Sequence, residues 1–307
     1  MFSPTLILTN DVEEVSIVNN NLNYNIAKKV ATEGLPKLLK LYSKYEIRAT
    51  FYFTGTFAKY FPEAVLEVLR QGSEVGCHGY SHLYSHAFDV MPIDQQYSHL
   101  LNAKKILEDI AGKIVSFRAP ALRLNSNTVK ILKHLDFNTD SSVAPQRFDG
   151  PLTSGSLNKL SWILSKRKPY FVGETLYKEG NSNLLEIPVS SFVFGYQGTT
   201  LRFSPNLNSI VESFLLSESK KNNYPLVFLF HPTEAVKEKR GKKSDRRSKT
   251  LLGYVLADKL RRTLKLKNLG PESLILLENL IKRHKDKDAL FMTASDYFTK
   301  VTNKNET

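Results

Sequence analysis

The chain has 307 residues, 41% hydrophobic and 11% aromatic. This composition supports a large core and excludes a disordered protein or a small disulfide-stapled scaffold. Lys and Arg (43) exceed Asp and Glu (30), and the net charge of +13 favours anionic partners. The single cysteine, Cys77, excludes a disulfide framework and a multi-cysteine zinc site. No apolar run reaches the roughly 18 residues of a membrane span and no signal peptide is recognisable, so we expect a cytoplasmic location.

Short β-rich apolar runs alternate with helical patterns along most of the chain. Because continuous apolar strands that alternate with helices are typical of a parallel sheet covered on both faces, we predict an α/β fold. Seven such units suit a barrel or a doubly wound sheet, and we favour the barrel. The expected strands are 6–10, 48–54, 74–77, 114–118, 138–141, 184–190 and 226–231, and the expected helices include 26–45, 63–71, 94–111 and 126–134.

Two segments interrupt this alternation. Residues 150–183 mix Gly, Pro, Ser and Lys and are expected to form an insertion, whereas residues 237–249 carry eight basic and two acidic side chains. We predict one domain over 1–307 with its core at about 5–235, followed by the basic loop 237–249 and a C-terminal extension over 250–299. In that extension we expect helices at 250–267 and 271–284 and a last strand at 289–293, and a frayed tail at 300–307.

Polar residues follow five of the predicted strands. Asp11, His78, Arg118, Asp140 and His231 each lie at or just past the carboxyl end of a different strand. In a parallel α/β barrel the loops that build active sites converge at this end. We therefore expect these five side chains to lie close together.

Two histidines in the segment His78-Gly-Tyr-Ser-His82 have a spacing that suits metal binding. At four residues apart they would lie about one helical turn from each other and face one cation. Such a pair, taken alone, more often lies on the surface or at a helix cap. His86 repeats the spacing and is either a competing ligand or part of the same face.

Acidic residues end the first strand. Asp11, Glu13 and Glu14 could supply a metal carboxylate and a general base, or form a solvated acidic turn. Arg118 could hold a carboxylate ionised through a bidentate pair, or form a structural salt bridge. Asp140 could be its partner, a supporting acid or a helix N-cap.

The run that ends in His231-Pro232 places an imidazole after a buried strand. A histidine there titrates near neutrality, as a general acid requires, although a satisfied core histidine is the simpler interpretation. Cys77 has no base near it in the sequence, and we interpret it as a small core residue.

Together these motifs resemble the polysaccharide deacetylase superfamily (NodB-homology, carbohydrate esterase 4-like), closest to its branch with an Asp-Val-Glu-Asp start. The likeness runs from Leu6 to about Glu234 and keeps the family's motif order. The most specific match is the histidine motif at 74–82. The other matching segments are Leu8-Thr9-Asn10-Asp11-Val12-Glu13-Glu14, Ala49-Thr50-Phe51-Tyr52-Phe53, Phe117-Arg118-Ala119-Pro120, Thr139-Asp140-Ser141-Ser142, Glu186-Ile187-Pro188-Val189-Ser190 and Phe230-His231-Pro232-Thr233-Glu234.

The resemblance implies a distorted (β/α)7 barrel and a metal-dependent hydrolase that removes N-acetyl groups from amino sugars. By the same resemblance, Asp11 would be the general base, tethered by Arg118, and His231 the general acid. Asp140 would belong to the surrounding shell. The metal would be held by His78, His82 and an acid of the first motif, and the substrate contacted by Tyr80, Pro120 and Pro232.

The chain departs from the family pattern at two places. Asn10 precedes Asp11 where many members have two adjacent aspartates, so we favour Glu13 as the carboxylate ligand and keep Glu14 as the alternative. Thr233 stands where the branch has a tryptophan after His-Pro, which puts substrate preference in doubt more than catalysis.

Zinc suits a set of nitrogen and oxygen ligands, while cobalt, nickel and iron are alternatives. The expected substrate is an N-acetylated carbohydrate of a glycan, glycolipid or small glycoside. Because the loop 237–249 is basic, this substrate could also be anionic. Two alternatives remain: an amidase or deformylase acting on a non-sugar C–N bond, and a non-catalytic module that binds anionic polymers or a membrane surface through 237–249. That segment contains no aromatic residue, which argues against nucleic acid.

Overall fold

The computed structural model describes residues 3–17, 21–146, 165–174, 178–238 and 261–305. Most of the basic loop 237–249, much of the insertion 150–183 and the start of the helix expected at 250–267 lie outside these residues. The expectations for those parts stay predictions.

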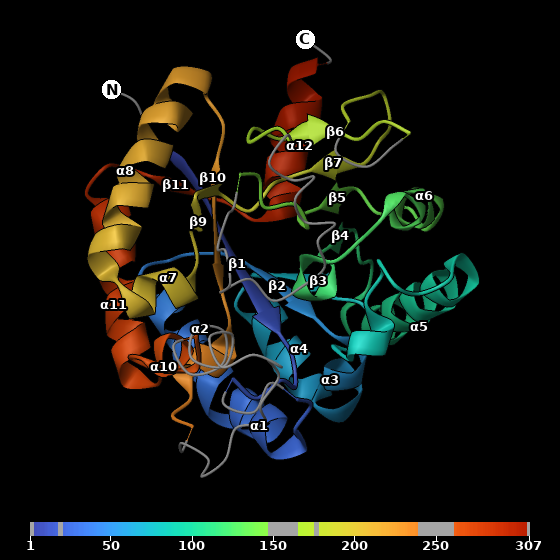
Figure 1. Ribbon diagram of the computed structural model, residues 1–307, viewed down its shortest axis with the longest axis horizontal. Helices are drawn as coiled ribbons and strands as arrows, with labels where there is room; N and C mark the ends of the chain where they lie inside the picture. Colours follow the sequence, from blue (N-terminus) through green and yellow to red (C-terminus); the bar gives the residue numbers. More distant parts are fainter. Residues whose placement is uncertain (1–2, 18–20, 147–164, 175–177, 239–260, 306–307) are drawn as a thin grey trace, which may run out of the picture.

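Seven parallel strands form one curled sheet in the order β10-β1-β2-β3-β4-β5-β7, and β6 adds an antiparallel edge (Figure 1). The strands are β1 (Thr5–Val12), β2 (Thr50–Phe53), β3 (Glu74–Cys77), β4 (Ser116–Phe117), β5 (Thr139–Asp140), β6 (Tyr170–Phe171), β7 (Leu185–Glu186) and β10 (Leu226–Phe230). The gap between the two ends of the sheet is bridged where Ser190 N donates to Val227 O at 3.1 Å. Val227 N in turn donates to Ser190 Oγ at 2.9 Å. The predicted distorted (β/α)7 barrel is confirmed.

The strands are apolar because both of their faces are covered. All five residues of β10 and seven of the eight residues of β1 are buried. Cys77 is buried at the end of β3, and this burial raises the pKa of its thiol to about 12. It has the environment of the core residue that we expected.

Helices pack around the sheet (Figure 1). The predicted helix at 26–45 is divided into α1 (Tyr24–Lys29), a π-turn (Val30–Gly34) and α2 (Leu35–Lys44). Predicted helices 63–71, 94–111 and 126–134 correspond to α4 (Pro62–Arg70), α5 (Ile93–Ala111) and α6 (Ser126–His134).

Several elements were not predicted. They are α3 (Gly55–Tyr60), α7 (Gly198–Phe203), α8 (Pro205–Asn222) and the small hairpin of β8 (Ser191–Phe192) and β9 (Phe194–Gly195). The start of α8 carries the usual signals, because Ser204 Oγ accepts from Leu207 N and Pro205 occupies the first turn. Its buried residues recur with helical spacing, but most of them are polar, so the apolar periodicity that reveals a surface helix is weak; they are Asn208, Val211, Glu212, Leu215 and Ser219.

The C-terminal extension joins the same sheet. Its elements are α10 (Arg261–Leu266), α11 (Pro271–Lys285), β11 (Leu290–Phe291) and α12 (Ala294–Asn305). Helix α11 and strand β11 confirm the expectations at 271–284 and 289–293, and β11 pairs with the start of β1. The expectation of a frayed tail at 300–307 was wrong for residues 300–305. Phe298 and Val301 pack against an apolar cluster that contains Ile7 and Val227, which holds α12 in place.

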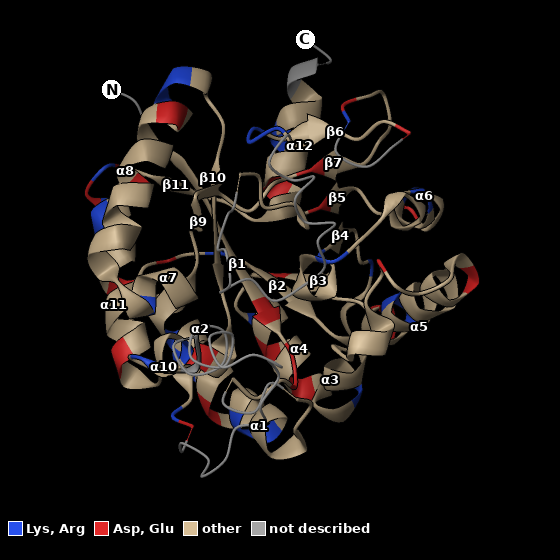
Figure 2. Cartoon of the chain, in the orientation of Figure 1, with Lys and Arg blue, Asp and Glu red and all other residues tan. Residues whose placement is uncertain are grey.

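Charged residues are distributed over the described helices. Figure 2 shows Lys and Arg interspersed with Asp and Glu around the sheet: helices such as α4, α5 and α11 carry both signs, whereas α2 and α6 carry lysines only. Among the described residues, no helix combines the length and the apolar character needed to cross a membrane.

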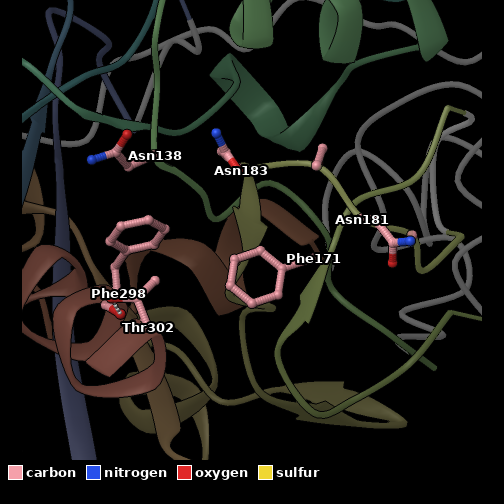
Figure 3. A pocket seen from close by; sticks show the side chains of 8 residues that line it. Asn138, Phe171, Asn181, Asn183, Phe298 and Thr302 are labelled. Carbon is pink, nitrogen blue, oxygen red and sulfur yellow. Dashed lines mark hydrogen bonds between the residues drawn. The ribbon is translucent and has the colours of Figure 1, made fainter. Parts of the chain in front are cut away.

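A cavity of about 470 Å³ lies at the amino-terminal end of β5, between the β6–β7 hairpin and α12 (Figure 3). Asn138, which directly precedes β5, and the rings of Phe171 and Phe298 line it. The residues expected to carry the chemistry lie at the carboxyl ends of the strands, so this cavity is at the opposite end of the barrel.

Candidate metal centre

Strand β1 brings the first set of functional side chains to the carboxyl end of the barrel. It extends to Val12, so Asp11 lies within the strand rather than just past it. Because side chains alternate along a strand, Thr9, Asp11 and Glu13 project to the same side. His231 directly follows β10, which pairs with β1, and His78 directly follows β3, which lies beyond β2, so both histidines lie at the same end of the barrel.

The two histidines of the 78–82 motif converge, but not for the predicted reason. The segment is irregular rather than helical, and Gly79 turns the chain with a φ of 68°. The His78 and His82 rings lie 5.9 Å apart between centroids. His78 Nδ1 lies 2.8 Å from Arg118 O and donates to it, which leaves Nε2 as the free acceptor.

Glu13, His78 and His82 form a cluster that fits a divalent ion. One ligand atom from each residue lies within 4.8 Å of the other two. Glu13 Oε2 is 3.6 Å from His78 Nε2 and 3.0 Å from His82 Nε2. Glu13 Oε2 and His78 Nε2 are buried and have no hydrogen-bond partner.

A bound cation would account for these short separations. The main-chain N–H of Ala121 donates to His82 Nε2 at 3.2 Å, so that nitrogen offers no proton to Glu13. Burial alone would raise the pKa of Glu13, but nearby imidazoles outweigh it and lower the pKa to about 2. A carboxylate oxygen and two imidazole nitrogens that lie within 4.8 Å of one another are the donor types that zinc and similar ions take in proteins.

The alternative ligands have other partners. Glu14 accepts from Thr54 Oγ1 at 2.7 Å and from Thr56 Oγ1, at the start of α3. His86 Nδ1 lies 2.6 Å from Ser81 Oγ, and its ring packs edge-on against His99. The geometry therefore favours Glu13 over Glu14 and leaves His86 out of the cluster.

Arg118 holds Asp11 from below the cluster. Its Nη1 donates to Asp11 Oδ1 and to Thr9 Oγ1, both at 2.9 Å. Its Nε and Nη2 donate to Ser141 O and Ser141 Oγ at 2.8 and 2.7 Å, and its guanidinium lies over the ring of Tyr52. Asp11 Oδ2, the other oxygen, is 3.8 Å from His78 Nε2 and 3.9 Å from His231 Nε2.

Asp140 is buried beside this group but does not hydrogen-bond to Arg118. It accepts from Ser142 Oγ and shares a hydrogen bond with Glu186, which in turn accepts from Val143 N at 3.0 Å. Burial raises the pKa of Asp140 to about 7 and, together with the charge of Asp140, raises the pKa of Glu186 well above its usual value. These raised pKa values favour a proton shared between the two carboxyl groups. The described residues that follow Asp140, 141–146, form no helix that it could cap.

His231 faces Asp11 on one side and Glu234 on the other. Its Nδ1 lies 3.1 Å from Glu234 Oε1, and its side chain is 27% exposed. Burial of the ring lowers its pKa, but the hydrogen bond to Glu234 and the charges of Asp11 and Glu13 outweigh it and raise the pKa to about 9. Glu234 forms a buried ion pair with Arg202 of α7.

The three residues expected at the substrate have different exposures. Tyr80 is half-buried and packs edge-on against His99, whereas Pro120 and Pro232 are buried at the starts of short 3₁₀ turns. Solvent reaches the centre through His82 and His231, which are 22% and 27% exposed.

Sequence reasoning missed Thr9, Ser141, Glu234 and Arg202 as supports of these side chains. A signal existed for two of them, because Thr9 shares a strand face with Asp11 and Glu234 follows His231 by three residues. No pattern in the sequence linked Arg202, which lies in an unpredicted helix, to this end of the barrel.

This chain resembles known deacetylases in sequence. The family model described as Polysaccharide deacetylase matches residues 21–139, a stretch that contains His78, His82 and Arg118. A peptidoglycan deacetylase of Helicobacter pylori is 33% identical over 166 residues, covering 52% of this chain and 54% of that protein. A peptidoglycan-N-acetylglucosamine deacetylase of Bacillus cereus is 30% identical over 105 residues, covering 34% of this chain and 47% of that protein.

The fold agrees with these matches. A Mycobacterium smegmatis structure described as a polysaccharide deacetylase superposes with a TM-score of 0.65 at 18% identity, over 99% of this chain and 91% of that one. The chain spans about half the length of the curated relatives it matches. The chain is similar to polysaccharide deacetylases over residues 21–139, and the order of its motifs and its barrel fold agree with that likeness.

Proposed function

We propose that the protein is a metal-dependent hydrolase that removes N-acetyl groups from an amino sugar in a glycan, glycolipid or small glycoside. The observation that carries the proposal is the convergence of Glu13, His78 and His82 beside Asp11 and His231. We further infer one catalytic domain, because β11 of the C-terminal extension pairs with β1, which contains Asp11 and directly precedes Glu13.

In this proposal Glu13, His78 and His82 hold one divalent ion, with zinc as the expected metal. Such an ion, when bound, polarises the acetyl carbonyl and makes water more acidic.

Asp11 has the position of a general base. Arg118 occupies Oδ1 and leaves Oδ2, which faces the centre between His78 and His231, to accept the proton of the attacking water. Because Arg118 is itself held by Thr9 and Ser141, the carboxylate keeps one orientation through the reaction.

His231 has the position of a general acid. An amine leaves poorly as an anion, so the sugar nitrogen must be protonated when the C–N bond breaks. His231 Nε2 faces Asp11, while the contact of Nδ1 with Glu234 favours the protonated ring that this role needs. The products are acetate and a free amino sugar.

The first test measures metal content and acetate release together. Protein purified without added metal is compared with the His82→Ala variant, and both are assayed for acetate released from N-acetylglucosamine oligomers and peptidoglycan fragments. We expect about one equivalent of metal and acetate release in the wild type, and loss of both in the variant. A wild type that stays metal-free after reconstitution would contradict the proposal. Formate or ring-opened products without acetate would point to another C–N bond.

A further inference from the structure

We infer that Arg202 and the segment 265–273 of the C-terminal extension are positioning residues for the general acid His231. The inference rests on the proposed function and adds to it a part of the chain outside the 5–235 core. It starts from Glu234, which contacts His231 through Oε1 and pairs through Oε2 with Arg202, a residue far away in the sequence.

Glu234 is fixed on its side chain by α7. Arg202 Nε pairs with Glu234 Oε2, and both side chains are nearly inaccessible, at 1% and 2% exposed. A Cβ at Gly198, one turn earlier in α7, would overlap both carboxylate oxygens of Glu234. Helix α7 therefore packs closely against Glu234 because Gly198 has no side chain, and Arg202 balances the charge of the Glu234 carboxylate. The other carboxylate oxygen, Oε1, contacts His231.

Arg202 is in turn held by the extension. Its Nη1 donates to the carbonyl oxygens of Lys265 and Lys267 at 2.6 and 2.8 Å. Asn268 Nδ2 donates to the carbonyl oxygen of Arg202 at 2.8 Å. The guanidinium is thus oriented by two main-chain groups that only the extension supplies.

The extension also holds the main chain of Glu234. Gly270 N and Ser273 Oγ donate to Glu234 O at 2.8 and 2.9 Å. Both ends of Glu234 are therefore fixed by residues that lie after position 261 or are held by them. Since an imidazole needs a fixed partner at Nδ1 to present its Nε2 proton in one direction, the extension completes the acid.

The test separates the acid from the rest of the site by its leaving group. Hydrolysis of an N-acetyl sugar breaks a C–N bond and requires a proton on nitrogen, whereas 4-nitrophenyl acetate releases a phenolate that needs none. Both reactions use the same base and metal centre. A defect in His231 positioning should therefore lower kcat for the amide and spare the ester.

We expect Arg202→Lys, which keeps the charge but loses the fork, to lower kcat for the amide on the order of tenfold, less than the full 10²–10⁴-fold of an acid. The KM for the amide and kcat for the ester should stay within about twofold of the wild-type values. Ser273→Ala should act in the same direction and leaves the buried ion pair intact. The matched control is Arg283→Lys, because Arg283 forms the ion pair of α11 with Glu212 at 2.7 Å and does not touch Glu234.

Nitrogen-15 NMR of the metal-free protein gives a readout besides activity. The Nδ1 proton of His231, assigned with His231→Gln, should show the downfield shift of a hydrogen-bonded ring N–H in the wild type and in Arg283→Lys, and lose that shift in Arg202→Lys. Equal losses of amide and ester activity, or an unchanged Nδ1 signal, would overturn this inference alone. A wild type that hydrolyses neither compound would overturn the proposed function together with it.

Discussion

Arg118 donates to Asp11 at 2.9 Å, and the two side chains are only 0% and 5% exposed. The pair joins β1, which contains Asp11, to the residue that directly follows β4, the strand Ser116–Phe117. A buried ion pair of this kind adds little net stability, but removing one partner leaves a charge without compensation. The arrangement therefore serves orientation, with one oxygen of Asp11 bound and the other presented to the centre.

Asp11→Asn should retain metal and lose turnover. The amide is close in size to the carboxylate but cannot accept the water proton, so we expect kcat to fall by about 10²–10⁴-fold. Metal content, measured on the same preparation, should match the wild type because the expected ligands are unchanged. Wild-type kcat in this variant would remove Asp11 from the mechanism.

Glu13→Gln and Glu14→Gln should separate the two possible carboxylate ligands. We expect Glu13→Gln to weaken metal binding, by at least the 10–100-fold that loss of a supporting group typically costs. Glu14→Gln should keep wild-type affinity, because its carboxylate is engaged by Thr54 and Thr56. Competition with a fluorescent chelator measures both constants, and weaker binding in Glu14→Gln alone would reverse the assignment.

His284 should make the protein less stable in acid. It is buried near Tyr196, Glu212, Arg283 and Lys287, and burial lowers its pKa from 6.5 to about 4. Between pH 6.5 and about 4, His284 is protonated in the unfolded chain but not in the folded chain. The free energy of unfolding is therefore highest above pH 6.5 and falls as the pH drops to about 4. The loss amounts to at most roughly 3 kcal/mol.

Urea unfolding between pH 4 and 7 would measure this effect. In His284→Gln the side chain does not titrate, so the difference in unfolding free energy between variant and wild type should change across that interval. A difference that stays constant with pH would exclude His284 as the cause.

Glu186 should make the folded protein more stable in acid than at neutral pH. Its pKa and that of Asp140 are raised by burial, Asp140 to about 7, so the folded state retains a proton that the unfolded chain gives up near 4.5. The contribution of Glu186 is full below 4.5 and is lost as the pH rises through its raised pKa in the folded state. Glu186→Gln should therefore lose less stability than the wild type between about pH 5 and pH 8. Thermal unfolding at both pH values checks this, and parallel losses would contradict it.

The sequence predicted which segments form the central strands better than it predicted where those strands end. Strand β3 has the predicted bounds, because a short apolar run between Gly72-Ser73 and His78 has one reasonable interpretation. Strand β1 is longer than predicted at its carboxyl end, since Asp11 is polar and yet buried by its contact with Arg118. Strand prediction from apolar runs therefore ends a strand too early where a polar residue such as Asp11 is buried in it.

The same reasoning explains what was found and missed at the site. His78, His82, Arg118 and His231 follow apolar runs and belong to ordered motifs, so their proximity could be expected. Arg202 could not be found, because its role depends on a helix that packs beside β10 and on carbonyl oxygens of residues 265 and 267. Such contacts between distant segments leave no local pattern.

Strand β1 pairs with β2 and also with β10 and β11, so its neighbours come from both halves of the chain. During synthesis, residues 5–12 leave the ribosome long before residues 226–230 and 290–291 exist. Asp11 and Glu13 must therefore wait in an incomplete sheet, with unpaired main-chain groups, until more than two hundred later residues have been added. Assembly of the centre is a late event of folding, and we expect nascent chains that stop before β11 to depend on chaperones.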